Sequence, residues 1–475
     1  MKPLADTKPP LGWMKSFVLL SVAVICFHLA YTPLQHPAFG LFIFGYAICL
    51  TQLTHQPTVR RAFYFGLATG FLCIAPQLIC FWEIFNAAAI VLWLVLAFWI
   101  GLFAAIVCAC IRRWGRAKAM WLVPFVWTGL EYFRSELYYL KFSWLNVGYA
   151  LPVGSALFGM YGVGFFIFAV FVVYFYKRLV KVSLVETFVF MAILAITAIS
   201  LFLTHPGFRA AFKRTNIWPT LSIVGVQMEF PPENILPTAL NNALKKNPDA
   251  RIFVLSEYTL QGPVPESLKT WCREHSRYLV VGGEDPVGTN NFYDTGFVVG
   301  TNGDIVFKQA KSVPIQFFRD GLPAKKQEVW NSPWGKIGIC ICYDLSYTRV
   351  TDELVKQGAQ LLIVPTMDVS DWGRHQHELH ALVAPVRAAE YGIPIFRLAS
   401  SGISQAVAGG GYVVAKTSFP GNGDVLSAKL GLPMSDSLPL DRYIAPFCVA
   451  ITAAVLILLT VLSLRERRLK DKTAP

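Results

Sequence analysis

The sequence predicts two structural classes in one chain, a multi-span α-helical membrane domain and an α/β domain. The first observation is composition: 55% of the 475 residues are hydrophobic and only 15% are charged, unlike an ordinary soluble protein. The second is that long apolar runs fill residues 16–203 and return near the end of the chain. The third is residues 204–442, where charged residues, turns and short strand-like runs replace them.

The apolar runs predict eight membrane spans, an even number that leaves both chain ends on one side. They cover residues 16–31, 39–53, 62–82, 87–111, 120–133, 155–176, 184–203 and 443–464. The fifth is short and contains Glu131. We therefore expect an N-terminal membrane domain with seven transmembrane helices at residues 1–203, an extramembrane domain at residues 204–442, and a transmembrane helix with a basic tail at residues 443–475.

The net charge of +13 is concentrated in short clusters between the apolar runs. These clusters lie at residues 60–61, 112–118, 177–181 and 465–472. With eight spans all of them fall on one face, which the positive-inside rule makes cytoplasmic. The domain at residues 204–442 then faces the periplasm of a bacterial inner membrane. No basic face interleaved with aromatic residues is visible, so we expect no nucleic-acid partner.

Residues 204–442 alternate strand-like and helix-like segments, which predicts a layered α/β architecture. The expected strands are residues 221–227, 251–257, 277–283, 291–300, 304–311, 336–343, 359–365, 394–399 and 405–416. The expected helices are residues 237–246, 265–275, 347–356 and 375–391.

Three chemically suited residues stand at the ends of expected strands. Cys342 lies in GICICYDL, Glu257 ends RIFVLSE, and Lys311 follows DIVFKQA. A carboxylate can take the proton of a thiol, and a fixed ammonium can stabilise a developing oxyanion. Cys340 lies inside the same run, where we expect burial to block access, whereas Cys342 lies at its edge. The ten cysteines show no metal-ligand spacing and no paired framework, so we expect no metal, cofactor or disulfide.

The order Glu, Lys, Cys resembles the carbon-nitrogen hydrolase (nitrilase) superfamily. That resemblance implies an α-β-β-α sandwich, with Glu257 as general base, Lys311 supporting the tetrahedral intermediate and Cys342 carrying a thioester. Lys308 is the rival for the lysine role. Strand alternation places Lys311 on the same face as Gln309 and Lys308 on the other, which favours Lys311.

The membrane part narrows the resemblance to the apolipoprotein N-acyltransferase family. The stretches that carry it are PFVWTGLEYFRSE, FSWLNVGYA, ICYD and SSGIS. The family implies transfer of a fatty acyl chain from a phospholipid, through a cysteine thioester, to the N-terminal amine of a diacylglyceryl-cysteine lipoprotein. Two alternatives remain open: a membrane-tethered amidase or nitrilase that uses water as acceptor, and a catalytically silent lipoprotein-binding module.

The loop KSVPIQFFRDG departs from the family pattern, which has a glutamate there. Either Gln316 or Asp320 stands where that acid is sought. The apolar pair Phe317 and Phe318 is suited to a lid that enters lipid. We count this pair as substrate-binding.

Two residues next to the nucleophile complete the predicted substrate-binding set. Tyr343 is either a packing residue or a wall of the acyl pocket, and Asp344 stands where the family has a glutamate.

Other polar residues have structural interpretations. The histidines of HQHELH, at positions 375, 377 and 380, are expected at a surface or helix end instead of in a metal cluster. Arg387 and Glu390 are expected to form an ion pair. Glu131 and Arg134 are either buried partners or contacts of a phospholipid head group, and a structural role is favoured.

Overall fold

The structure is a computed structural model that describes residues 9–32, 38–152, 154–179, 219–433 and 438–473. The chain divides into two compact units. One contains residues 1–202 and 440–475 and is helical; the other contains residues 203–439 and is α/β. Each unit is described by itself.

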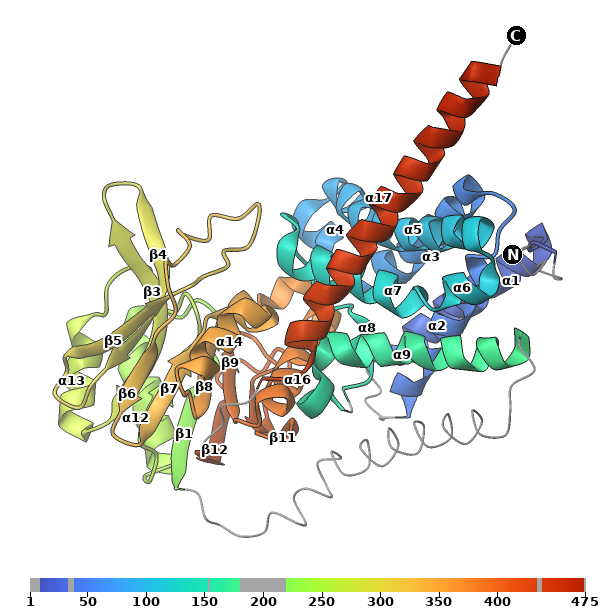
Figure 1. The fold of residues 1–475 in the computed structure, drawn as a ribbon. Coiled ribbons are helices and arrows are strands. Elements are labelled where there is room, and N and C mark those ends of the chain that lie inside the picture. Colours follow the sequence, from blue (N-terminus) through green and yellow to red (C-terminus); the bar gives the residue numbers. More distant parts are fainter. Residues whose placement is uncertain (1–8, 33–37, 153, 180–218, 434–437, 474–475) are drawn as a thin grey trace. The chain divides into compact units, whose positions relative to one another are not determined.

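The helical unit consists of apolar helices joined by short loops (Figure 1). Its described elements are α1 (Trp13–Ala30), η1 (Phe39–Leu41), α2 (Phe42–Leu53), α3 (Val59–Gln77), α4 (Cys80–Phe85), α5 (Ala88–Trp114), α6 (Arg116–Met120), α7 (Val123–Tyr132), η2 (Phe133–Leu137), α8 (Val147–Ala150), α9 (Ser155–Leu179) and α17 (Asp441–Thr473). Among the described residues, four helices are long and apolar enough to cross a membrane: α1, α5, α9 and α17. These four helices are typical of a multi-pass membrane protein.

The number of spans stays a prediction. The expected second and fifth spans form shorter helices, α2 preceded by η1 and the ten-residue α7. The expected span at residues 184–203 lies outside the described residues.

Small residues let the helices of this unit approach one another closely. A Cβ atom added to Gly66 of α3 would lie 2.8 Å from the Cβ atom of Ala104 on α5. One added to Gly129 of α7 would lie 2.5 Å from the carbonyl oxygen of Cys448 on α17. Such contacts replace the hydrophobic effect as the source of helix association in lipid.

The start of α17 is fixed against α9 by a buried carboxylate. Asp441 accepts a hydrogen bond from the backbone N–H of Tyr161 at 3.0 Å. Gly159 has a φ of 69° there and lies so close to Asp441 that a Cβ atom would clash at 2.1 Å. Only glycine combines this backbone conformation with that approach.

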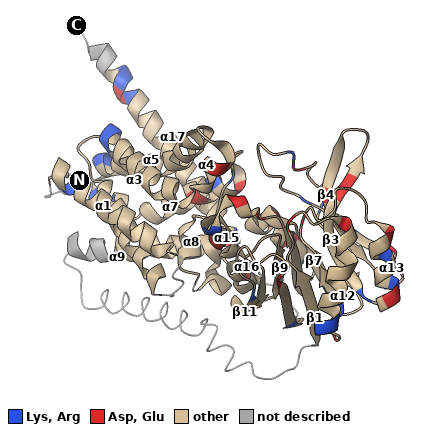
Figure 2. Ribbon diagram, turned by 180° about the vertical axis from the view of Figure 1, so that it is seen from behind, with Lys and Arg blue, Asp and Glu red and all other residues tan. Residues whose placement is uncertain are grey.

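The opposite end of α17 is basic and lies beside two other basic segments. Arg113, in the last turn of α5, forms an ion pair with Glu466 of α17. Arg112 donates to the carbonyl oxygen of Pro57, which precedes α3. Most of the described basic residues of this unit therefore gather at one end (Figure 2).

The α/β unit contains two six-stranded sheets (Figure 1). Their strands are β1 (Thr220–Val226), β2 (Ile252–Val254), β3 (Tyr278–Val287), β4 (Asn291–Val299), β5 (Ile305–Ala310), β6 (Val329–Ser332), β7 (Gly335–Ile339), β8 (Leu361–Thr366), β9 (Ile395–Ala399), β10 (Gln405–Ala408), β11 (Tyr412–Lys416) and β12 (Val425–Gly431). The first sheet has the order β12-β1-β2-β3-β4-β5 and the second β11-β10-β9-β8-β7-β6. In each sheet the central strands are parallel and the edge pairs antiparallel.

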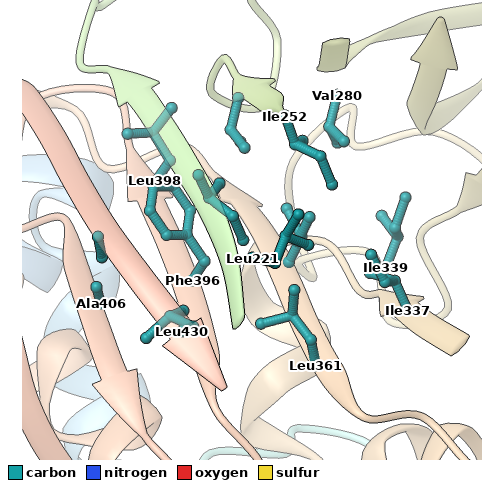
Figure 3. Packing of buried hydrophobic residues seen from close by; sticks show 14 of the residues in the cluster. Leu221, Ile252, Val280, Ile337, Ile339, Leu361, Phe396, Leu398, Ala406 and Leu430 are labelled. Atoms are coloured by element: carbon teal, nitrogen blue, oxygen red, sulfur yellow. The ribbon is translucent and has the colours of Figure 1, made fainter. Parts of the chain in front are cut away.

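The main core lies between the sheets. Branched side chains from both sheets meet there, such as Ile252 and Val280 from the first sheet and Ile337 and Leu361 from the second (Figure 3). These residues are fully buried. Because alternate residues of a strand face opposite sides, their neighbours form a second layer on the outer face of each sheet.

Helices cover the outer faces. The helical elements of this unit are η3 (Glu233–Ile235), α12 (Leu236–Lys246), α13 (Glu266–His275), η4 (Cys342–Ser346), α14 (Thr348–Lys356), η5 (Ser370–Trp372), α15 (Arg374–Ala381) and α16 (Val383–Tyr391). Helices α12 and α13 pack on the first sheet, where Leu240 and Trp271 join a buried cluster with Phe253. Helices α14 and α16 lie against the second sheet. The predicted two-sheet α/β architecture is therefore confirmed.

The sequence-based elements differ from the structure in the following places. Strands β6 and β12 are not among the expected ones. The single strand expected at residues 405–416 is two strands, β10 and β11, which pair antiparallel with each other. The single helix expected at residues 375–391 is two helices, α15 and α16, separated at Leu382. Pro385 lies in the first turn of α16, where its missing N–H costs nothing.

Candidate active site

The predicted nucleophile occupies a strained turn after a parallel strand. Cys342 follows β7 by three residues and begins the short helix η4. Its φ is 48°, a left-handed conformation that costs a non-glycine residue about 1–3 kcal/mol and clusters at functional sites.

Glu257 and Lys311 reach the same place from the other sheet. Glu257 follows β2 by three residues, and Lys311 comes directly after β5. The Nζ atom of Lys311 lies 2.7 Å from Oε1 of Glu257. The other oxygen of Glu257 accepts the backbone N–H of Met367 at 2.6 Å. The Sγ atom of Cys342 donates to the carbonyl oxygen of that same Met367 at 3.7 Å, so the structure brings all three predicted residues together.

Two further carboxylates surround the Lys311 ammonium. Asp320 lies 2.7 Å and Asp294 3.3 Å from Nζ. Asp320 also accepts the Tyr258 hydroxyl at 2.8 Å and the backbone N–H of Ile315 at 2.6 Å. Of the two loop residues considered as the missing acid, Asp320 is the one that contacts the lysine.

This group of carboxylates has the spacing of a cation site, since one oxygen from each of Glu257, Asp294 and Asp320 lies within 4.8 Å of the others. The Lys311 ammonium already stands among them at 2.7–3.3 Å. A lysine thus supplies the positive charge that a metal ion would otherwise bring.

The electrostatics of the site keep the thiol neutral and the lysine charged. Burial, followed by the charge of Glu257, raises the pKa of Cys342 well above its usual range. Burial alone would lower the pKa of Lys311, but Asp320 and Glu257 raise it well above normal. A neutral thiol beside a carboxylate needs that carboxylate as a base before it can attack.

The Asp344 side chain accepts hydrogen bonds from the backbone of the segment that follows Lys311. Its carboxylate is fully buried and accepts the backbone N–H groups of Ser312 at 3.0 Å, Val313 at 2.8 Å and Ile341 at 3.3 Å. Burial raises its pKa to about 6, while these N–H groups act in the opposite direction. The structure therefore supports a positioning role for Asp344, and its predicted contact with substrate remains untested.

The remaining predicted binding residues differ in exposure. Tyr343 is buried and packs edge-on against Tyr347, with ring centroids 4.9 Å apart. Phe317 is 67% exposed and Phe318 38% exposed, and Phe318 lies 6.2 Å from the ring of Trp372.

The distinction drawn between the two cysteines needs a correction. Cys342 was expected at an accessible edge, but it is 2% exposed and Cys340 is fully buried. Burial raises the pKa of both thiols. What separates them is contact, because the Cys342 thiol adjoins Glu257 and Lys311, whereas the charged neighbour of Cys340 is Asp344.

The two candidate lysines occupy different environments. Lys311 is fully buried among carboxylates. The Lys308 side chain is 57% exposed and pairs with Asp285 at 2.6 Å. This difference follows the strand alternation expected from the sequence.

A second buried charged cluster, missed by the sequence analysis, lies directly after Met367. Asp368 accepts hydrogen bonds from Arg397, from Gln376 at 3.0 Å and from His380 at 2.8 Å. All four side chains are buried. Burial alone would raise the pKa of Asp368, but His380 and Arg397 offset this and lower it. The cluster holds the segment whose backbone contacts both Glu257 and Cys342.

The expected surface exposure was wrong for two of the histidines. His377 is fully buried and His380 is 1% exposed, although His380 lies in the last turn of α15, as expected of a residue at a helix end. The signal that could have found their burial is the helical spacing of three, which places both on the inward face of α15. Arg397 lies in the middle of the buried strand β9.

Two further pairs of charged residues had been expected to have structural roles. Arg387 and Glu390 form the predicted ion pair at 2.5 Å. Glu131 and Arg134 are both buried in the helical unit. Glu131 accepts the backbone N–H of Val147 at 3.0 Å, and Arg134 donates to Asn146, so both have protein partners.

Two family models match the chain. A model described as the apolipoprotein N-acyltransferase N-terminal domain matches residues 23–173. A model described as carbon-nitrogen hydrolase matches residues 216–434.

Curated relatives match a part of the chain. An omega-amidase from Xenopus laevis is 27% identical over an alignment of 119 residues, which covers 22% of this chain and 42% of that protein. A deaminated glutathione amidase from Dictyostelium discoideum is 28% identical over an alignment of 139 residues, which covers 25% of this chain and 46% of that protein. The chain thus spans less than half the length of these relatives.

Solved structures are also similar. A carbon-nitrogen hydrolase from Helicobacter pylori has a TM-score of 0.40 at 18% identity, covering 45% of this chain and 90% of that one. Nit3 from Saccharomyces cerevisiae, described as a nitrilase superfamily member, has a TM-score of 0.39 at 20% identity, covering 49% and 94%.

Proposed function

Because this chain belongs to the family that joins an apolipoprotein N-acyltransferase N-terminal domain to a carbon-nitrogen hydrolase domain, we propose that it acylates the N-terminal amine of lipoproteins. The donor is a phospholipid, and the acceptor carries a diacylglyceryl-cysteine at its N-terminus. One observation supports the chemistry most directly: a buried thiol, a carboxylate and an ammonium share one site, with Lys311 2.7 Å from Glu257.

In the first half-reaction, Glu257 takes the proton of Cys342 and the thiolate attacks the ester carbonyl of the phospholipid. Lys311 and neighbouring backbone N–H groups stabilise the oxyanion. The carbon-oxygen bond then breaks, and Glu257 returns its proton to the departing lysophospholipid oxygen. The acyl group is left on Cys342 as a thioester.

In the second half-reaction, the amine of the diacylated peptide attacks the thioester. Glu257 takes a proton from the attacking nitrogen as the carbon-nitrogen bond forms. The thiolate leaves and recovers that proton, so Cys342 ends as a neutral thiol. The raised pKa of the Cys342 thiol favours this final protonation.

The apolar helices favour a lipid substrate over a small soluble amide. The 29-residue stretch Asp441–Leu469 of helix α17 contains an 18-residue apolar segment of which only 17% is buried in the protein. Its exposed apolar side chains require lipid around them. The exposed pair Phe317 and Phe318 suits contact with an acyl chain, and we propose it as part of the donor site.

We further propose that the catalytic domain faces the periplasm and both chain ends the cytoplasm. Basic residues of α5 and α17 lie at the same end of the helical unit, and the catalytic domain is joined to the opposite end of α17. A reporter active only in the periplasm should give signal when fused after Lys311 and none when fused after Lys472. The reverse pattern would contradict the eight-span topology.

The proposed acylation is tested by incubating the purified protein with phospholipid that carries a labelled acyl chain. We expect a single hydroxylamine-labile acyl group on the peptide that contains Cys342, and its transfer when a diacylated peptide is added. Cys342→Ala should show neither, while Cys340→Ala, two residues away, should retain both. Turnover of the peptide by Cys342→Ala would refute the thioester.

A second candidate is a membrane-tethered amidase, which the amidase relatives favour. In that case water, not an amine, would release the acyl group. Hydrolysis of small amides by the wild type, without uptake of acyl chains from phospholipid, would replace the first proposal by this one.

A further inference from the structure

The Lys311 site has more carboxylates than positive charges. One ammonium faces Glu257, Asp294 and Asp320, and all four side chains are buried. If every group were ionised, the cluster would carry two uncompensated negative charges away from water. Charges that are buried without compensation take up a proton instead.

Hydrogen-bond donors identify which carboxylates stay ionised. Both oxygens of Glu257 are engaged, by Lys311 and by the backbone N–H of Met367. Both oxygens of Asp320 are engaged, by Tyr258 and by the backbone N–H of Ile315, with Lys311 alongside. Donors of this kind stabilise the charged form of a carboxylate.

Asp294 is different. Among the described residues, neither of its oxygens accepts a hydrogen bond, and its one ion pair is with the Lys311 ammonium at 3.3 Å. It is fully buried on β4. Its carboxyl group lies against Glu257, within the 4.8 Å cluster. A carboxylate without donors in this place would be costly, whereas a carboxylic acid can donate to Glu257.

We propose that Asp294 is a neutral carboxylic acid in the resting protein and a positioning residue for Glu257, to which it donates its proton in a hydrogen bond. The role in acyl transfer rests on the proposed function; the protonation itself does not. With Asp294 neutral, the cluster carries one net negative charge, and Glu257 stays ionised and able to accept the Cys342 proton.

Ionisation of Asp294 would then oppose catalysis. A further negative charge beside Glu257 and Lys311 weakens the stabilisation that Lys311 can give to the thiolate and the oxyanion. The titratable groups that face Asp294 are Glu257 and Tyr258 after β2, Glu284 directly opposite on β3, Lys311 after β5 and Asp320 in the following loop. Burial, then the charge of Glu257, raises the pKa of Asp294 well above its usual value.

Infrared spectroscopy tests the protonation without any substrate. In protein labelled with ¹³C-aspartate, we expect a protonated carboxylic acid band at neutral pH that is absent from Asp294→Asn. Asp285→Asn, the matched control on the neighbouring strand β3, removes a carboxylate that pairs with Lys308 outside this cluster and should keep the band. In Asp294→Glu the band should persist but lose its isotope shift, which covers the case in which the amide variant does not fold. Absence of the band from the wild type at neutral pH would overturn the proposal.

The pH profile of Cys342 acylation tests the positioning role. Because an amide can donate the same hydrogen bond as a neutral acid, Asp294→Asn should acylate faster than Asp294→Ala near neutral pH. The alkaline loss of activity of Asp294→Asn should begin at higher pH than in the wild type. Loss at every pH, or an unchanged profile, would refute the role. If the wild type takes up no acyl chain at all, the proposed function fails while the infrared result still stands.

Discussion

Two clusters of buried charged residues lie on either side of the Met367 backbone, and the pKa of a buried aspartate shifts in opposite directions in the two. Around Lys311, three carboxylates share one permanent cation, and the pKa of Asp294 is raised. Around Arg397, a single carboxylate has a guanidinium and a histidine as partners, and the pKa of Asp368 is lowered. Burial is the same in both places, so the ratio of acids to bases decides where a proton resides.

On the proposed function, this difference separates a reactive cluster around Lys311 from a structural cluster around Asp368. A site that must take a proton from a thiol and return it needs carboxyl groups near a change of protonation. A cluster that fixes a loop benefits from a permanent ion pair whose charges do not change. The Asp368 cluster serves the reactive one, because it holds the segment that contacts Glu257 and Cys342.

The largest expected effect is that of removing the cation from the reactive cluster. Lys311→Met should lower Cys342 acylation by at least about 10²- to 10³-fold, the range for loss of an oxyanion donor. It should also leave the ionised Glu257 and Asp320 without a compensating cation, which favours uptake of a proton by one of them. Single-turnover measurement with labelled phospholipid checks this, and near-normal acylation would show that Lys311 is not the oxyanion partner.

Removing the carboxylate from the cluster around Asp368 should lower the stability of the fold more than the rate of acylation. Asp368→Asn leaves Arg397 as an unpaired buried cation, which costs about 3–5 kcal/mol. Thermal unfolding in detergent micelles at pH 7 should show a large drop in melting temperature. Because the pKa of Asp368 is lowered by folding, the wild-type contribution is complete above its unfolded pKa of about 3.9 and is lost as pH falls below that value. The variant and wild type should therefore converge at low pH, and a deficit that persists there would contradict the ion pair.

The corresponding aspartate-to-asparagine change in the cluster around Lys311, Asp294→Asn, should raise the melting temperature instead of lowering it. The pKa of Asp294 is raised by folding, so its destabilising effect grows as pH rises above the unfolded value of about 3.9 and is largest above the folded pKa. Asp294→Asn should therefore unfold at a higher temperature than the wild type at pH 8, with a smaller gain at pH 5. A lower melting temperature at pH 8 would mean that Asp294 is an ionised partner of Lys311.

The smallest effect should come from the exposed lysine. Lys308 pairs with Asp285 at the surface, and such pairs contribute about 0.2–1 kcal/mol. Lys308→Ala should leave acylation within about twofold of wild type and the melting temperature nearly unchanged. Equal loss of activity from Lys308→Ala and Lys311→Met would show that strand alternation did not separate their roles.

Much of the fold could be predicted from the sequence because its patterns are local. Apolar runs predicted the helices of the helical unit, and alternation of strand-like and helix-like segments predicted a layered α/β domain that the structure confirms. The Arg387–Glu390 pair followed from a spacing of three on a helix. Strands β6 and β12 were missed because both lie at sheet edges and are interrupted by polar or turn residues.

Only part of the candidate site could be predicted from local sequence patterns. Glu257, Lys311 and Cys342 were chosen by residue type, strand end and family resemblance, and their catalytic roles stay predictions. The sequence did not single out Asp294, because an aspartate in a strand is usually assigned to the solvent-facing side. Its burial is visible only in the folded structure. The sequence likewise did not predict that His380 and Arg397 contact Asp368.

By itself, the sequence determined the division into apolar and α/β segments, the strand ends near the three predicted catalytic residues and the alternation that separates Lys311 from Lys308. These depend on hydrophobic period and order along the chain, which are properties of neighbouring residues. Only the tertiary structure decided that Asp320 contacts Lys311, that Asp294 lies beside Glu257 without a hydrogen-bond donor among the described residues, and that both cysteines are buried. Each of these depends on which distant segments exclude water from the same place, and burial and charge ratio arise only when those segments meet.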